Sequence, residues 1–470
     1  MSLSDNADPR AASSTPHAGP GRVRRRRALT AVLASLAIVV TVAAAGGLVW
    51  QISAVASPRT GVFTPPEAYP PAEPALVLAS SNADAPVPGL ESVLPDLLAD
   101  DRLNGTLGAS FADVLTGEVL YEQNGMTPLA PASSMKIVTA VAAFEQLGAE
   151  YRIPTTVVEG PTEDSVVLVA GGDVTLTVDG EGYYSAYAEC ASLTDLADAV
   201  LEARGGTAPA TVYLDTSLFT DNPKAEGVPT GDLATMTAPM APIMIDGGRI
   251  DNTEKYAERY PDPAKAAAQE FADLLGAGEV AEGTADADAA EVATVYSAPM
   301  AGLVDAFILT SDNTLADAIS LQTGLAVEGE MTWAAMSAAH LSTIEGLGVD
   351  TAGMVFYDGS GLSPDDRITA TGFAQVLLGA ASSQSASVFQ ALPVAGYSGT
   401  LHDRFGTAED GKGVVRAKTG TLTGVSSLTG TLTTLDGRQL VFSLITNDHT
   451  SGDVEAALDE ISAAVSQCGC

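Results

Sequence analysis

Alternating apolar and polar positions predict two β-hairpins, one early and one late in the chain. Residues 107–121 alternate on either side of a turn at Thr116-Gly117, which is the pattern of half-buried strands joined by a tight turn. Residues 425–434 and 438–446 show the same alternation around Leu435-Asp436-Gly437. These segments predict an antiparallel sheet.

Helical spacing accompanies both hairpins. Ile137, Val141 and Phe144 recur at i, i+4 and i+7 within residues 134–147, and Gly148 follows as a stop signal. A second helix is predicted over residues 453–466, and the long segment between the hairpins holds short strand-like runs and acidic low-complexity sequence. The chain is therefore predicted to be α+β, an antiparallel sheet flanked by helices, with an inserted domain.

The N-terminus has the pattern of a membrane anchor. Arg22 and the four arginines at 24–27 precede residues 28–50, which are apolar and uncharged. A helix of that length crosses a hydrocarbon core of ~30 Å, and its basic flank stays in the cytoplasm. We therefore expect a cytoplasmic tail at 1–27, one transmembrane helix at 28–50 as a single-pass signal-anchor in the cell membrane, and an extracellular remainder. A cleaved signal peptide, cut after Ala56, is the alternative.

Proline dominates the segment that follows. Eight prolines fall between Pro58 and Pro88, with little periodic hydrophobicity, and this composition favours an extended, semi-rigid chain over a packed core. Residues 51–90 are expected to form an extracellular spacer. The alternative is that residues after Ala75 form an irregular arm packed on the folded body.

Composition narrows the chemistry. The chain carries 59 Asp and Glu against 22 Lys and Arg, a net charge of −37, so its body repels phosphate backbones and no nucleic-acid partner is expected. Four His and three Cys are present, without the spacing of a zinc site. Catalysis by Ser, Lys or carboxylates fits this inventory better than catalysis by a His-based triad.

Three short motifs follow one another beyond the anchor. Ser133-Ser134-Met135-Lys136 places a serine at a helix start and a lysine one turn later on the same face, where backbone N–H groups favour a developing oxyanion. Ser311-Asp312-Asn313 is the second motif and Lys418-Thr419-Gly420-Thr421 is the third. Gly420 is expected because a side chain there would block the close approach of a substrate backbone. Taken singly, an ordinary helix cap or a protected edge strand also explains such motifs.

Together and in this order, the motifs resemble those of the class C low-molecular-mass penicillin-binding proteins, the D-alanyl-D-alanine carboxypeptidase/endopeptidase type. The separation of 178 positions from Ser133 to Ser311 matches the inserted domain of this class and distinguishes it from class A β-lactamases. The resemblance spans roughly residues 90–470 and includes five further segments: 169–173, 245–249, 358–363, 392–401 and 416–422.

The resemblance implies a penicillin-binding, β-lactamase-like serine transpeptidase fold. We expect a catalytic domain at residues 91–155 and 297–470, interrupted by an inserted domain at 156–296. It implies a serine D-Ala-D-Ala carboxypeptidase or DD-endopeptidase that acts on peptidoglycan stem peptides, is acylated by β-lactams and needs no metal or organic cofactor. A β-lactamase-type hydrolase and a non-catalytic peptidoglycan-binding module are the alternatives.

Residue roles follow from the resemblance and from acyl-transfer chemistry. Ser133 is expected to be the nucleophile and Lys136 its base, with a pKa lowered by burial and by the nearby cation Lys418. Asn313 would hydrogen-bond the substrate amide and the Lys136 amine, and Ser311 would relay a proton to the leaving D-alanine. Lys418 would attract the terminal carboxylate with Thr419 and Thr421 as partners, and the oxyanion hole would be the N–H groups of Ser133 and Thr421.

The residues that would recognise the distal end of the substrate are assigned from the resemblance alone. An acidic residue of the inserted domain and a basic residue after the Gly-Leu-Ser turn would read the stem-peptide side chain. Asp232 is the best-placed acid, with a solvated surface carboxylate as the alternative, and Leu362 marks the turn as substrate-binding. Arg367 follows that turn only after Pro364-Asp365-Asp366.

The three cysteines lie beyond the anchor, where thiols tend to oxidise. Cys190 is predicted to pair with Cys468 or Cys470.

Overall fold

The computed structural model describes residues 82–231 and 235–469. The expected tail, anchor and spacer up to residue 81, together with Asp232 and Cys470, lie outside the described residues. Within the described ranges, no helix is both long enough and apolar enough to cross a membrane.

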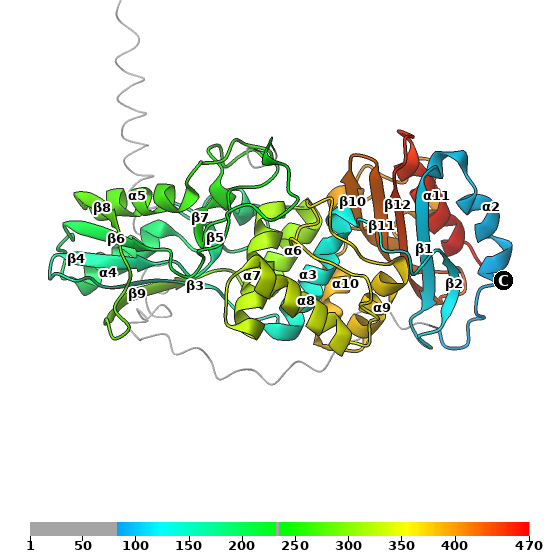
Figure 1. The fold of residues 1–470 in the computed structure, drawn as a ribbon, viewed down its shortest axis with the longest axis horizontal. Coiled ribbons are helices and arrows are strands. Elements are labelled where there is room, and N and C mark those ends of the chain that lie inside the picture. Colours follow the sequence, from blue (N-terminus) through cyan, green and yellow to red (C-terminus); the bar gives the residue numbers. More distant parts are fainter. Residues whose placement is uncertain (1–81, 232–234, 470) are drawn as a thin grey trace, which may run out of the picture. The chain divides into compact units, whose positions relative to one another are not determined.

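The first sheet joins the two ends of the described chain. Its five antiparallel strands lie in the order β10-β11-β12-β1-β2, so the early hairpin lies beside the late one (Figure 1). In this sheet Phe111 opposes Phe442 with ring centroids 5.8 Å apart. Both predicted hairpins are confirmed. The bounds are β1 Thr106–Asp113, β2 Val119–Gln123, β10 Val415–Leu422, β11 Val425–Thr433 and β12 Gln439–Asn447.

Helices bury both faces of this sheet. On one face Phe442 and Leu444 pack in a core with α11 (Val454–Ser466) and α2 (Leu94–Leu98). On the other face Val441 and Ile445 join a core with α3 and α9, which explains why β12 is apolar on both sides. The helices on this second side are α3 Lys136–Gln146, α6 Met300–Thr310, α7 Asn313–Glu328, α8 Trp333–Gly346, α9 Ala370–Ala381 and α10 Val388–Ala391.

A second sheet lies in sequence between α3 and α6 (Figure 1). Its strand order is β8-β6-β4-β3-β9, with β4, β6 and β8 parallel and β3 antiparallel to both of its neighbours. It has its own apolar core, built with α4 and α5. The bounds are β3 Pro154–Glu159, β4 Ser165–Val169, α4 Leu193–Ala203, β6 Thr211–Asp215, α5 Pro263–Leu275, β8 Glu279–Glu282 and β9 Glu291–Tyr296. We call residues 154–296 the inserted region.

A small parallel pair of strands and two short helices complete the inserted region. The pair is β5 (Asp173–Leu176) with β7 (Ile243–Ile245). The short 3-10 helices are η4 (Tyr184–Ala186) and η6 (Asp246–Gly248), and η6 directly follows β7. The mixed α+β class predicted from the sequence is thus observed in both sheets.

Residues 82–90 are packed on the body, although their proline content assigned them to the spacer. Asn82 N–H donates to Gly437 O, and Arg438 Nη1 donates to Ala85 O at 3.0 Å. Ala85 and Leu90 are buried. Hydrogen bonds and a few buried apolar residues without a regular period hold this arm. Residues 82–90 thus follow the packed-arm alternative, and the spacer boundary at 90 is wrong for them.

The predicted pairing of Cys190 with Cys468 is also wrong. Cys190 carries a free thiol beside the core of the helices around α3. Cys468 is buried in the other core, beneath α11. A disulfide needs Cα atoms within about 7 Å, and two separate cores keep these residues apart.

Candidate active site

Ser133 lies on a strained turn rather than at the start of a regular helix. The 3-10 helix η3 (Ala132–Met135) precedes α3, which begins at Lys136. Ala132 has a φ of 48°, a left-handed conformation that costs a non-glycine residue of order 1–3 kcal/mol. Ser133 is partly exposed between buried neighbours, so the turn presents its hydroxyl to solvent while fixing its backbone.

Buried hydroxyls hold this turn against the first sheet. Ser134 Oγ donates to Lys418 O at 3.2 Å and lies 2.8 Å from Ser427 Oγ. Ser427 Oγ donates to Pro131 O at 2.7 Å. Ser134 is therefore the inward anchor of η3.

Gly420 is required by the packing of the protein itself. A Cβ at this position would lie 2.5 Å from Pro131 O and closer still to Ser427 Oγ. The absence of a side chain at Gly420 lets β10 approach η3, and its role toward a substrate backbone stays a prediction. This approach brings the third motif beside the first.

Lys136 contacts the hydroxyl of Ser133 and two further oxygens. Its Nζ donates to Ser133 Oγ at 3.1 Å, to Asn313 Oδ1 at 2.7 Å and to Ser360 O at 2.7 Å. The side chain is fully buried. Burial lowers the pKa of Lys136 from its ordinary 10.5 to about 8, because an ammonium loses more solvation than an amine. At pH 8 about half of the lysine is then a neutral base, and at neutral pH a minority is.

Charged neighbours also shift the pKa of Lys136, some upward and some downward. Asp317, Asp358 and Asp312 act to raise the pKa of Lys136, and the cation Lys255 acts to lower it. The sequence had suggested Lys418 as that cation. The pKa of Lys418 is itself lowered, first by burial and then by Lys136.

The second motif supplies Asn313 and Ser311 from the junction of two helices. Ser311 ends α6 with a left-handed φ of 57°, and Asn313 begins α7. Asn313 Oδ1 accepts from Lys136, and its Nδ2 donates to Met236 O at 3.0 Å. The first two motifs are therefore in direct contact, and one amide proton of Asn313 is engaged by the inserted region.

The third motif lies on edge strand β10. Lys418 is fully buried and its Nζ donates to Thr419 O at 2.7 Å. Thr419 Oγ1 donates to Thr400 Oγ1, and the exposed Thr421 donates to Glu455 of α11 at 2.7 Å. The structure thus gathers Ser133, Lys136, Asn313 and the Lys418–Thr421 strand around one surface.

The sequence analysis linked Leu362, Arg367 and Asp232 to recognition of the distal side chain of the substrate. The Leu362 side chain is buried in a small cluster with Ala225 and Val228 of the inserted region. Arg367 Nη1 donates to Pro364 O and Asp366 O at 2.7 Å, so its guanidinium folds back on its own turn. Asp232 lies outside the described residues.

Three contributors to the site were not singled out from the sequence. The Ser360 carbonyl accepts from Lys136, and the loop that carries it is held by Asp317 Oδ1, which accepts from Gly359 N–H. Asp358 accepts N–H groups from Ser360 and Ser363 of the same loop. Asp317 could have been found, because it lies one turn after Asn313 on α7 and shares its face. The Ser360 carbonyl could not have been found in this way, because every residue carries a backbone carbonyl and the sequence does not show where it points.

Comparison with known proteins agrees with this geometry. The profile of the family described as D-Ala-D-Ala carboxypeptidase 3 (S13) matches residues 90–258 and 251–465. A carboxypeptidase of Mycobacterium tuberculosis is 35% identical over 88% of this chain and 92% of its own length. Carboxypeptidase DacB of Mycolicibacterium smegmatis is 34% identical over 96% of this chain and 99% of its own length.

Among solved structures, penicillin binding protein 4 of Haemophilus influenzae has a similar fold. The TM-score is 0.65 with 21% identity, covering 78% of this chain and 97% of that one. At this identity the likeness concerns the fold.

Proposed function

Because the chain belongs to the D-Ala-D-Ala carboxypeptidase 3 (S13) family, we propose that it removes the terminal D-alanine from peptidoglycan stem peptides through a Ser133 acyl-enzyme. The protein is an enzyme, a serine-type D-Ala-D-Ala carboxypeptidase. The same chemistry cleaves a cross-link whose acyl donor is a D-alanine carbonyl, so DD-endopeptidase activity belongs to the proposal. β-Lactams are its acylating inhibitors.

The observation that carries the proposal is the contact between Lys136 Nζ and Ser133 Oγ at 3.1 Å. A serine hydroxyl needs a base within hydrogen-bond reach, and that base works best with a pKa near the working pH. Burial brings the pKa of Lys136 to about 8. Lys136 therefore fulfils both conditions without a histidine.

Acylation can be followed atom by atom. Lys136 Nζ takes the proton of Ser133 as Oγ bonds to the carbonyl carbon of the penultimate D-alanine. The backbone N–H groups of Ser133 and Thr421 stabilise the oxyanion, and losing one such donor typically costs about 10²–10³ in rate. The bond to the terminal nitrogen then breaks, Ser311 relays a proton to that nitrogen, and D-alanine leaves. Water attacks the ester in the same way and releases the shortened peptide.

The other motif residues orient the substrate. Asn313 Oδ1 fixes the Lys136 amine at 2.7 Å, and its remaining amide proton is available to the substrate carbonyl. Lys418, Thr419 and Thr421 bind the terminal carboxylate. An approaching anion favours the protonated form of the buried Lys418, so the substrate carboxylate stabilises the positive charge of this lysine.

We place the enzyme at the outer face of the cell membrane. The apolar residues 28–50 after the basic cluster support a single-pass anchor, and peptidoglycan lies on that side. The alternative of cleavage after Ala56 would release the same catalytic region.

Release of D-alanine from an acylated tripeptide ending in D-Ala-D-Ala tests the proposal. The enzyme should release one D-alanine per peptide and leave the D-Ala-L-Ala analogue intact. A Lys136→Met variant that keeps its thermal unfolding temperature should lose most of this activity. Absence of release by the folded wild type, or rapid β-lactam hydrolysis in its place, would contradict the proposal.

A further inference from the structure

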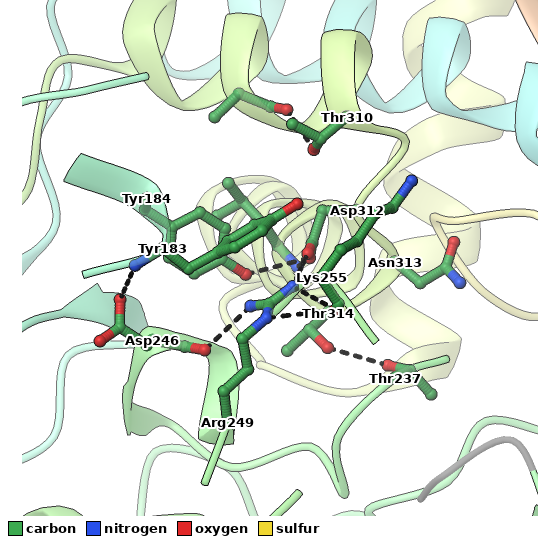
Figure 2. Close-up of polar contacts among 12 residues, drawn as sticks. Tyr183, Tyr184, Thr237, Asp246, Arg249, Lys255, Thr310, Asp312, Asn313 and Thr314 are labelled. Carbon is green, nitrogen blue, oxygen red and sulfur yellow. Dashed lines mark hydrogen bonds and ion pairs between the residues drawn. The ribbon is translucent and has the colours of Figure 1, made fainter. Parts of the chain in front are cut away.

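The middle residue of the second motif is gripped by the inserted region. Arg249 Nη2 and Asp312 Oδ2 form an ion pair at 2.6 Å, with side-chain exposures of 0% and 3%. Tyr184 Oη donates to the other carboxylate oxygen at 3.0 Å. Figure 2 shows Arg249 and Tyr184 converging on Asp312 next to Asn313. We call Arg249, Tyr184 and Asp312 the clamp.

The inserted region is built to hold Arg249 in place. Its guanidinium carbon lies 3.7 Å from the ring centroid of Tyr183, and Nη1 donates to Asp246 O at 2.9 Å. Gly247 has a φ of 63°, and a Cβ there would lie 2.6 Å from Tyr184 Oη. The Ile245–Arg249 segment has no role in the reaction steps above. Its conformation serves to orient Arg249.

The clamp acts on the two catalytic neighbours of Asp312. Asp312 Oδ1 also accepts from Leu315 N–H at 2.9 Å and so caps α7. On one side Ser311 is held at a φ of 57°, which a serine adopts only when its surroundings impose it. On the other side Asn313 Oδ1 orients the Lys136 amine at 2.7 Å.

We propose that Asp312 and Arg249 are positioning residues through which the inserted region sets the orientation of Ser311 and Asn313 for acylation. This inference rests on the proposed function, because it concerns the same acyl transfer. The inserted region then completes the catalytic machinery from outside the substrate pocket.

The protein offers a matched control for a purely structural ion pair. Asp113 and Arg438 form another buried Arg–Asp pair, with exposures of 0% and 6%, and it joins β1 to the turn before β12. If buried pairs matter only for folding, both pairs should behave alike in every assay.

The test measures acylation by a chromogenic β-lactam, separating binding from the rate constant at saturation, beside thermal unfolding. In Asp312→Asn and Arg249→Met the saturating rate constant per folded molecule should fall on the order of 10²-fold, the usual effect of an ångström-scale displacement, with little change in binding. Arg249→Lys should recover part of the loss. Asp113→Asn should lower the unfolding temperature and leave acylation unchanged.

The pH profile of acylation provides a second measurement, which a purely structural role of the clamp would leave unchanged. Lys136 faces Asp317, Asp358, Asp312, Lys255 and Lys418. Asp312→Asn removes one anion and leaves Arg249 uncompensated, so the acid limb of acylation should move to lower pH.

The outcomes separate the two claims. If the wild type is acylated, and Asp312→Asn and Arg249→Met keep its rate and Asp312→Asn keeps its acid limb, the positioning role is overturned while the proposed function stands. If the folded wild type is not acylated at all, the proposed function itself fails.

Discussion

At the scale of single residues, the site depends on burial of Lys136. An exposed lysine stays protonated at neutral pH, whereas this one loses its solvation and keeps three oxygen acceptors. The three acceptors orient the amine toward Ser133. Three buried aspartates and one cation then set how far its pKa falls.

The first prediction concerns the pH dependence of acylation. Lys136 must be deprotonated to act, so the second-order rate constant should rise with pH through about 8. Lys255→Met removes a cation that lowers the pKa of Lys136, so the acid limb should move to higher pH. Lys265, exposed on α5, provides the control, because Lys265→Met should leave the limb in place. Stopped-flow acylation between pH 6 and 10 gives the answer, and an unmoved limb in Lys255→Met would refute this electrostatic role.

The second prediction concerns the close approach of β10 to η3 at Gly420. Gly420→Ala places a methyl group 2.5 Å from Pro131 O, so β10 and η3 must separate. The free energy of unfolding should fall by about 1–3 kcal/mol, as for overpacked cores, and acylation should slow. Gly406→Ala has no atom within 4 Å of the new Cβ and should match the wild type. Equal behaviour of the two variants would show that the approach is not rigid.

The motif spacing was enough to predict the Ser133–Lys136 contact, because a helical turn brings i and i+3 together. It was not enough to predict the environment that makes Lys136 a base. Asp317, Asp358 and the Ser360 carbonyl reach Lys136 only through packing of α7 and of the loop at residues 358–363. Such tertiary neighbours carry no local signal.

At the scale of elements, the two hairpins and the last helix were predictable, because their alternation follows from burial on a sheet. The start of α3 was not, since η3 breaks the helical pattern before Lys136. Strand-like runs at β4 and β6 were visible in the sequence, but the parallel pairing of β4, β6 and β8 was not predicted. A short apolar run shows that a strand is buried without showing which strand it pairs with.

The third prediction tests how the hairpins of the first sheet are joined. The Asp113 carboxylate pairs with Arg438, which follows the late hairpin turn. Burial alone would raise the pKa of Asp113, but hydrogen bonds from Arg438 and from backbone N–H groups hold it below its ordinary value. This contribution to stability is therefore present above about pH 4, the unfolded pKa, and is lost as pH falls below it.

Asp113→Asn leaves Arg438 buried without its partner. The free energy of unfolding at neutral pH should fall by about 3–5 kcal/mol, and the variant should lose the part of the acid dependence that Asp113 contributes. Denaturant titrations at pH 7 and pH 3 measure both effects. If the difference in the free energy of unfolding between variant and wild type is as large at pH 3 as at pH 7, the ion pair is not the cause of that difference.

At the scale of the whole molecule, the sequence separates the first two motifs by an insertion, and the structure connects them through it. The inserted region has its own core, yet it reaches Asp312 through Arg249 and Asn313 through Met236 O. The length of the insertion and its short strand-like runs could be seen in the sequence. Its contribution to the site depends on contacts between residues more than 60 positions apart.

The central claim is that Ser133 forms the acyl-enzyme, and covalent labelling tests it most directly. The wild type incubated with benzylpenicillin should gain one adduct, which proteolysis and mass spectrometry should place on the peptide containing Ser133. Ser133→Ala should fold normally, because Ser133 is partly exposed and the change removes its hydrogen bond with Lys136 without emptying a core, and it should gain no adduct. An adduct on any other residue, or one that persists in Ser133→Ala, would contradict the account.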